Sequence, residues 1–344
     1  MLLSRTRLAA LQGATGLLLA LVACAPIGAQ ESSPFSRMVP QGRMSASIAA
    51  AEFSPDGKVL AVTAQSADED GSTALLQVPD LKVLGELGAM PDQVHCLAFG
   101  GPDGGLLCAG GRKGRITIWD LRQGKLLTSF YPRWGTMNLR AAFLPDPRLL
   151  YVEGGSYTGT VIDWTRSRDR EPSVFLSMKQ NLPSPVWALS PAGKVMHVAH
   201  IDDTGLVVNR LSDGAQVAKT EGSGWLSSLR AIAWSADGSS FAVLQGMTVS
   251  VWDATTGKRR STFNVSAGPA SCAVFTPDLR WVAIARGSWV KEGETLAVWD
   301  VTGGRQAHTL ATGCPRITGM ALSNAGRHLF VYGYAGGALL GSVD

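Results

Sequence analysis

Residues 110–127 read GGRKGRITIWDLRQGKLL, and this stretch decides the fold of the whole chain. It contains a glycine turn, a short run of alternating polarity, Trp119-Asp120, a second glycine turn and the start of another run. Alternation between two turns is typical of neighbouring β-strands. The architecture depends on whether this hairpin occurs once or is one copy of a repeat.

Seven turn segments recur along the chain at a nearly constant interval. The first, residues 53–57 (FSPDG), has proline and glycine where a type I turn prefers them. Successive spacings are 46, 44, 46, 45, 41 and 47 residues, and the other segments begin at Phe99, Phe143, Leu189, Trp234, Phe275 and Leu322. A period of this length indicates a repeat architecture.

Each repeat predicts four short strands. A small, apolar strand precedes the turn, a second strand such as KVLAVTA follows it, and a fourth strand follows a later glycine turn. The third strand ends in Trp119-Asp120, Asp163-Trp164, Trp252-Asp253 or Trp299-Asp300. This pattern resembles the blades of a WD-repeat β-propeller. The resemblance implies an all-β fold, a seven-bladed β-propeller with four antiparallel strands per blade.

The sequence departs from this family in two respects. The Gly-His pair that many WD repeats carry before the first strand does not occur, and the fourth repeat has Asn209-Arg210 in place of Trp-Asp. Divergent blades are expected, but the apolar pattern is kept.

The two ends of the repeat region predict how the ring closes. The chain stops after the third strand of the seventh repeat, whereas residues 35–43 (FSRMVPQGR) remain before the first repeat. Because blades bury each other's faces only in a ring, we expect this segment to supply the outer strand of the seventh blade. Pro40 is compatible with an outer strand, which has one unpaired edge.

The first residues have the composition of an export signal. Arg5 and Arg7 precede an apolar run that is short for a membrane span. Residues 21–24 (LVAC) resemble the lipobox of bacterial lipoproteins, which implies acylation at Cys24. The alternatives are a conventional signal peptide cut after Ala29, an uncleaved anchor, or an intracellular scaffold whose N-terminus has been misread.

We therefore expect a signal peptide over residues 1–23, a linker over 24–37 and the propeller over 38–344. The lipobox resemblance implies an exported protein of the bacterial cell envelope, lipid-anchored on the periplasmic or cell-surface side. The formal net charge is +4, and two of the positive charges lie in this leader. Such a weak excess does not favour nucleic acid as a partner.

Catalytic and cofactor motifs do not occur in the sequence. It has no H-E-x-x-H, C-x-x-C, G-x-S-x-G or P-loop pattern. We expect no enzyme activity, no cofactor and no metal ion. The alternative is a propeller that binds or hydrolyses a lactone or sugar at the mouth of its central channel. The residues three before each turn segment supply one charge there, Arg140, which disfavours that alternative.

Cysteine positions suggest one covalent bond. Cys96 and Cys108 are equidistant from a turn centred on Pro102, which would place them opposite each other on antiparallel strands. In an exported protein such a pair could form a disulfide, and two buried free thiols are the alternative.

The sequence predicts protein partners on one rim of the ring. Loops between blades and turns between second and third strands share this rim, and aromatic and basic side chains are favoured as binding anchors. We expect Tyr334 there, together with ten further candidates: Asp68, Asp70, Arg112, Lys113, Trp134, Tyr157, Asp202, Trp225, Trp289 and Lys291.

Overall fold

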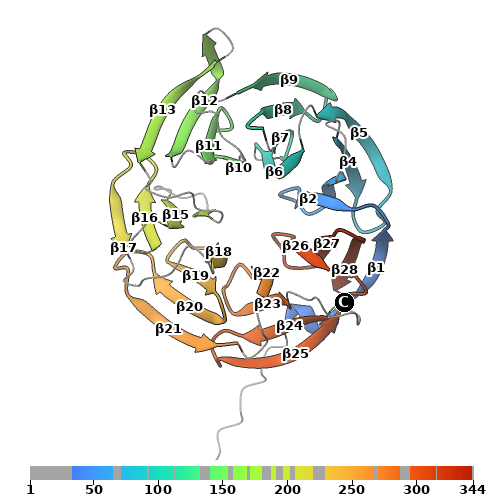
Figure 1. Ribbon diagram of the computed structural model, residues 1–344, viewed down its shortest axis with the longest axis vertical. Coiled ribbons are helices and arrows are strands. Elements are labelled where there is room, and N and C mark those ends of the chain that lie inside the picture. The colour runs from blue at the N-terminus through green and yellow to red at the C-terminus, as the bar shows by residue number, and fades with distance from the viewer. Residues whose placement is uncertain are drawn as a thin grey trace, which may run out of the picture. The chain divides into compact units, whose positions relative to one another are not determined.

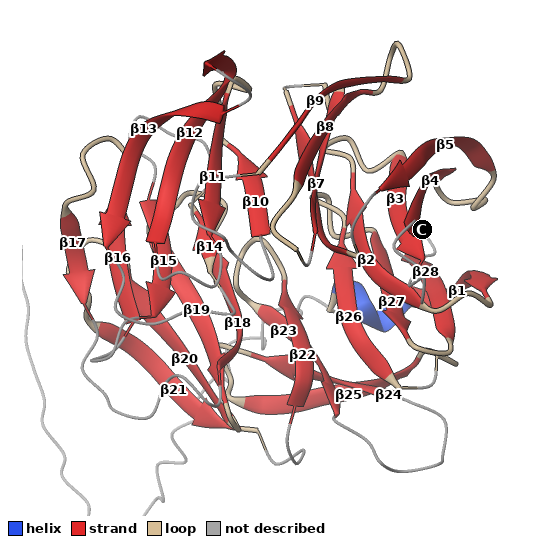
Figure 2. Cartoon of the chain, turned by 45° about the horizontal axis from the view of Figure 1, so that its top comes forward, coloured by secondary structure: helices blue, strands red, loops and turns tan. Residues whose placement is uncertain are grey.

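The structure is a computed structural model, and it describes most of the chain from Ser33 onward. The described residues are 33–64, 71–90, 93–101, 103–111, 113–131, 140–153, 158–168, 171–179, 187–190, 197–201, 206–219, 229–265, 270–286, 295–314 and 316–342. Strands make up nearly all the regular structure of these residues, with the 3-10 helix η1 (Pro34–Arg37) as the helical element (Figure 2).

The strands form seven antiparallel sheets of four, which we call blades one to seven. Blades one to three contain β2 (Ile48–Phe53), β3 (Val59–Ala64), β4 (Gly71–Gln77), β5 (Val83–Met90); β6 (Val94–Gly100), β7 (Leu106–Gly111), β8 (Ile116–Asp120), β9 (Lys125–Phe130); and β10 (Arg140–Phe143), β11 (Leu149–Glu153), β12 (Thr158–Arg168), β13 (Glu171–Lys179).

The remaining blades complete the ring (Figure 1). They contain β14 (Ala188–Leu189), β15 (His197–Ile201), β16 (Leu206–Arg210), β17 (Gln216–Lys219); β18 (Leu229–Trp234), β19 (Ser240–Gln245), β20 (Thr248–Asp253), β21 (Arg259–Asn264); β22 (Ala270–Phe275), β23 (Trp281–Arg286), β24 (Thr295–Asp300), β25 (Arg305–Ala311); and β26 (Ile317–Leu322), β27 (His328–Gly333), β28 (Gly336–Ser342), β1 (Met38–Met44). The predicted seven-bladed propeller is confirmed.

Neighbouring blades share their cores. Leu244 of blade five and Ile284 of blade six are both fully buried and belong to one apolar cluster. Tyr151 of blade three meets Trp187 beside blade four edge to face, with ring centroids 4.8 Å apart. Because each blade is apolar on both faces, the ring removes both faces from water, which is the main stabilising contribution.

The turns between first and second strands form as the sequence predicts. In blade one the Gly57 amide donates to the Ser54 carbonyl at 2.8 Å, and Gly57 adopts φ +71°. The Ser54 hydroxyl donates to Asp56 at 2.7 Å and accepts from the Val59 amide at 2.9 Å. Glycine reaches this left-handed backbone conformation without steric cost, which explains its place in the repeat.

The predicted closure of the ring is also confirmed. β1 pairs with β28 in blade seven, with Met38 opposite Ser342. Pro40 lies on this outer strand, just before a register shift at Gly42. The blade is therefore built from both ends of the described chain.

The first strand of the propeller begins at Met38, and residues just before it also pack against the ring. Residues 34–37, assigned to the linker, form η1, whose start is capped by the Ser33 hydroxyl. Phe35 is fully buried and packs in one cluster with Met38 and Trp281. Since burial of one phenylalanine contributes about 1.5–3 kcal/mol, this turn belongs to the compact unit, which begins at Ser33.

Candidate functional site

The predicted rim is described in part. Lys113 is exposed in the turn between β7 and β8, and Tyr334 is 61% exposed in the turn between β27 and β28. Both turns join a second strand to a third, as predicted. Met247, in the equivalent turn of blade five, is 46% exposed, and the sequence reading missed it because a methionine carries no charge or ring.

The other predicted site residues lie outside the described residues. They are Cys24, Asp68, Asp70, Arg112, Trp134, Tyr157, Asp202, Trp225, Trp289 and Lys291.

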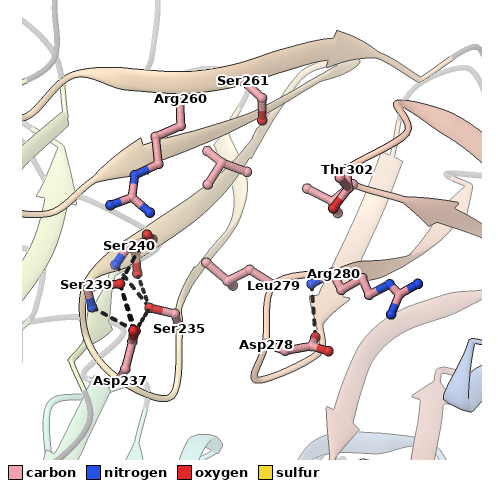
Figure 3. Close-up of a pocket in the computed structure, with 12 residues that line it drawn as sticks. Ser235, Asp237, Ser239, Ser240, Arg260, Ser261, Asp278, Leu279, Arg280 and Thr302 are labelled. Carbon is pink, nitrogen blue, oxygen red and sulfur yellow. Dashed lines mark hydrogen bonds between the residues drawn. The ribbon is translucent and has the colours of Figure 1, made fainter. Parts of the chain in front are cut away.

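A groove of about 520 Å³ lies between blades five and six, on the rim opposite Tyr334 (Figure 3). Its walls come from the first turns of both blades, from β21 and from the last turn of blade six. The lining residues are Ser235, Asp237, Ser239, Ser240, Val251, Arg260, Ser261, Asp278, Leu279, Arg280, Val301 and Thr302. The sequence does not predict this groove, because its residues belong to separate turns and strands that come together only when the ring closes.

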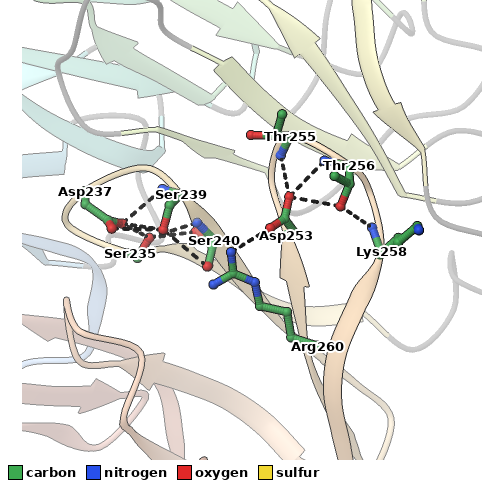
Figure 4. A network of polar contacts seen from close by, with 9 residues as sticks. All are labelled: Ser235, Asp237, Ser239, Ser240, Asp253, Thr255, Thr256, Lys258 and Arg260. Carbon is green, nitrogen blue, oxygen red and sulfur yellow. Dashed lines mark hydrogen bonds and ion pairs between the residues drawn. The ribbon is translucent and has the colours of Figure 1, made fainter.

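The acidic side chains at the groove hold turns in place (Figure 4). Asp237 accepts hydrogen bonds from the Ser235 hydroxyl at 2.6 Å and from the Ser239 amide at 3.0 Å. The hydrogen bond from Ser235 is the main reason that the pKa of Asp237 falls to about 2. This carboxylate is therefore occupied in stabilising its own turn.

Arg260 connects the groove to the Trp-Asp turn of blade five. Its guanidinium donates to Asp253 at 2.6 Å and holds the pKa of that carboxyl well below its usual range. Asp253 also accepts from the amides of Thr255 and Thr256, at 3.0 and 2.8 Å. Asp120 and Asp300 accept two amide hydrogen bonds each in the equivalent turns. The aspartates that recur at the ends of third strands thus cap turns.

The tryptophans before these aspartates serve as packing residues, as predicted. Trp252 and Trp299 are 5% and 4% exposed. The indole nitrogens of Trp119 and Trp299 are buried without a hydrogen-bond partner in the described part of the chain. The missing Gly-His fits this finding, since its histidine belongs to the network that includes Trp in the family the sequence resembles. An unsatisfied buried donor costs about 1–3 kcal/mol.

A second polar group lies on the inner strands, and we call it the axial cluster. It comprises Glu52 on β2, Cys96 on β6, Arg140 on β10, Cys272 on β22 and Tyr332 on β27. Burial raises the pKa of the Cys96 thiol, Arg140 lowers it, and Glu52 raises it, so both charged side chains lie within electrostatic reach of Cys96. Burial raises the pKa of Tyr332 well above its usual range, with contributions from Cys272 and Glu52.

Glu52 is exposed to solvent yet enclosed by the inner strands. The residue is exposed as a whole, while the surrounding inner strands replace much of the hydration of its carboxyl. This desolvation raises the pKa of Glu52 to about 7. Perturbed carboxyls of this kind are over-represented at binding and catalytic sites.

The predicted opposition of Cys96 and Cys108 is wrong. Cys96 lies opposite Gly110, and Cys108 lies opposite Ala98. The strands continue to Gly100 and Leu106, so the turn is centred one residue later than Pro102. Both cysteines are free thiols in the structure.

No group of three or more potential metal ligands occurs among the described residues. No helix in that part of the chain is long and apolar enough to cross a membrane.

The fold and these turns define a class of protein: a seven-bladed β-propeller in which three of the third strands end in Trp-Asp. Comparison with known proteins supports the WD-repeat family. Residues 82–120, from the start of β5 to the end of β8, match the family model "WD domain, G-beta repeat".

A curated relative shares part of the repeat region. Over 164 residues, 48% of this chain, the sequence is 27% identical to Telomerase protein component 1 of Mus musculus. The chain spans 6% of the length of that relative, so the likeness concerns a small part of it.

Proposed function

We propose that this chain is a non-catalytic scaffold that binds protein partners on the rim of its second-to-third strand turns. The exposed Tyr334 carries the proposal, because a large aromatic side chain on a rigid turn is a favoured interface anchor. Lys113 and Met247 extend the same rim. The match to a WD repeat supports an interaction role for the ring.

The test is capture of partners from the native cell envelope by the full chain. Tyr334→Ala combined with Lys113→Ala should reduce the recovered partner at least about tenfold, as expected for loss of a hot-spot residue. Thr255→Ala, at an exposed position on the opposite rim, is the matched control. Equal recovery by the double variant and the control would remove the case for this rim.

We also propose that the protein is exported and held on a membrane by acylated Cys24. A basic start, an apolar run and the LVAC sequence support this proposal. Several acyl chains together bind a bilayer far more firmly than one. Cys24→Ala should move the protein from the detergent phase to the aqueous phase of an envelope extract. A mature protein that begins at Gln30 would instead identify a conventional signal peptide.

A further inference from the structure

Two charged side chains of opposite sign stand on either side of one inner strand. Glu52 on β2 and Arg140 on β10 are both exposed, and β6 contacts both strands. Within the described part of the chain, neither side chain forms a hydrogen bond or an ion pair. Two opposite charges that do not pair with each other can be bridged by one ligand that carries both signs.

The wall between these two charges is small and neutral where β6 passes between them. Cys96 and Ala98 are half-buried there. The Cys96 sulfur accepts a hydrogen bond from the Ala141 amide of β10 at 3.3 Å, which joins this wall to the strand that carries Arg140. The raised pKa keeps the thiol neutral, so it compensates neither neighbouring charge.

Tyr332 builds the wall on the other side of Glu52. Its ring lies where Gly319 has no side chain, since a Cβ on Gly319 would stand 2.3 Å from Cζ of the ring. The ring stacks on Phe330, with ring centroids 6.0 Å apart. The phenol is thus held by packing.

Among the described residues, no basic side chain forms an ion pair with the carboxyl of Glu52. Arg140 is near enough to affect Cys96, but desolvation is what sets the pKa of Glu52, at about 7. An ammonium group beside this carboxyl would replace the lost hydration. A carboxylate beside Arg140 would form the charge-assisted, bidentate pair that a guanidinium favours.

We propose that the axial cluster binds a small zwitterion, such as an amino acid with its two charges separated by a short chain. Its ammonium group contacts Glu52, its carboxylate contacts Arg140, and its methylene groups lie over Cys96. This site is distinct from the partner-binding rim and does not depend on the scaffold function.

The test is calorimetric titration of the full chain at pH 8 with glycine, β-alanine, 4-aminobutyrate and 5-aminopentanoate. One chain length should give saturable binding, since the two charges have a fixed separation. Acetate and ethylamine each offer one of the two contacts and should bind at least about tenfold more weakly. Absence of saturable binding by any of the four would overturn the proposal.

Matched variants locate the site. Glu52→Gln and Arg140→Gln should each weaken binding of the preferred amino acid at least about tenfold. Arg230→Gln is the control, because it removes the same charge from the exposed position of another inner strand. Binding by either axial variant that equals binding by the control would refute the assignment, provided that near-ultraviolet circular dichroism shows a native ring.

The pH dependence gives an independent readout. Because the ligand selects the ionised Glu52, affinity should fall about tenfold for each pH unit below 7. Cys96 and Tyr332 have raised pKa values and stay neutral over this range. His95→Gln on β6 should keep the profile, because the proposal assigns the pH dependence to Glu52. If the affinity of Glu52→Gln does not vary with pH, the proposal is supported. If this variant keeps the pH profile of the wild-type protein, the proposal is contradicted.

Discussion

The last turns of blades four and five have the same backbone but different side-chain support. In blade five the Asp253 amide donates to the Lys258 carbonyl, and in blade four the Arg210 amide donates to the Ala215 carbonyl, at 2.9 and 2.8 Å. The fifth residue of each turn is a glycine in the left-handed region, Gly257 at φ +65° and Gly214 at φ +73°. The main-chain shape is therefore common to both.

The difference lies in where the carboxylate stands. Asp253 is the first residue of its turn, and its carboxylate accepts hydrogen bonds from two amides of the same turn. In blade four Arg210 occupies that position and pairs at 3.2 Å with Asp213, which accepts the Ala215 amide at 3.0 Å. The Asn209 amide closes the turn by donating to the Gly214 carbonyl at 2.9 Å. A blade can thus lose Trp-Asp when other side chains supply contacts that hold the same turn.

The largest difference in stability is expected between substitutions of Trp252 and Asn209, the residues that precede the two turns. Trp252→Ala should lower the free energy of unfolding by about 3–5 kcal/mol, because a buried indole leaves a cavity. Asn209→Ala should cost about 1 kcal/mol, the value of one hydrogen bond. Denaturant titration measures both. Equal losses of stability in the two variants would mean that burial of the Trp252 indole adds no more stability than one hydrogen bond.

The two glycines should be equally important. Gly257→Ala and Gly214→Ala should each cost about 1–2 kcal/mol, because a Cβ disfavours the left-handed backbone. Gly257→Ala also brings a Cβ to 3.1 Å from the Lys219 carbonyl of blade four, so it should be at the upper end. If either substitution were neutral in denaturant titration, the shared backbone would not explain the shared turn.

The capping aspartates should come next. Asp253→Ala should lower Tm by about 2–4 °C at pH 7, since two amides and Arg260 lose their acceptor. Asp213→Ala should lower it less, because one amide and one exposed ion pair are lost. Differential scanning calorimetry compares them. A larger loss in blade four would show that its turn depends on the carboxylate more than blade five does.

Acid should weaken blade five through its carboxylates. The pKa of Asp237 is lowered to about 2 by hydrogen bonds from Ser235 and Ser239. A lowered pKa stabilises the fold above the unfolded pKa of about 4, and this contribution is lost as pH falls towards 2. Asp237→Asn should therefore take up about one proton fewer on unfolding between pH 4 and 2. The slope of stability against pH measures this, and Thr255→Ala should keep the wild-type slope.

The smallest effect is expected from restoring the acid in blade four. Arg210→Asp should change the free energy of unfolding by no more than about 0.5 kcal/mol, because loss of an exposed ion pair is offset by a new acceptor for turn amides. Chemical denaturation resolves this difference. A large destabilisation would show that the two capping modes are incompatible on one backbone.

Features that depend on local pattern could be predicted from the sequence. The FSPDG-type turns, the blade count and the closing strand follow from repeat spacing and from residues 35–43 left over at one end. The burial of Phe35 could not be predicted, because a single apolar residue beside a polar linker does not indicate which part of the fold packs against it. The strand partner of Cys96 depends on where the turn is centred. Because Gly100 belongs to β6 and pairs with Leu106, the turn is centred one residue later than the sequence predicts.

The axial cluster was beyond the sequence reading for a different reason. That reading took one residue from each first strand and found Arg140. Glu52 lies two residues nearer the turn than the equivalent position, and Tyr332 comes from a second strand over Gly319. The residues of this cluster come from five blades, and only the closed ring brings them together. The rim candidates outside the described residues and the acylation of Cys24 remain predictions.

The closing strand has a mechanical consequence. Since β1 joins blade seven, tension on the segment before Ser33 reaches η1 and the β1–β28 hydrogen bonds before it reaches any other blade. Drawing β1 away would extract Phe35 from its pocket and uncover the free edge of β28. If the ring is tethered through its leader, a pulling force therefore acts first on the β1–β28 pairing. The other six blades would stay intact while this pairing opened.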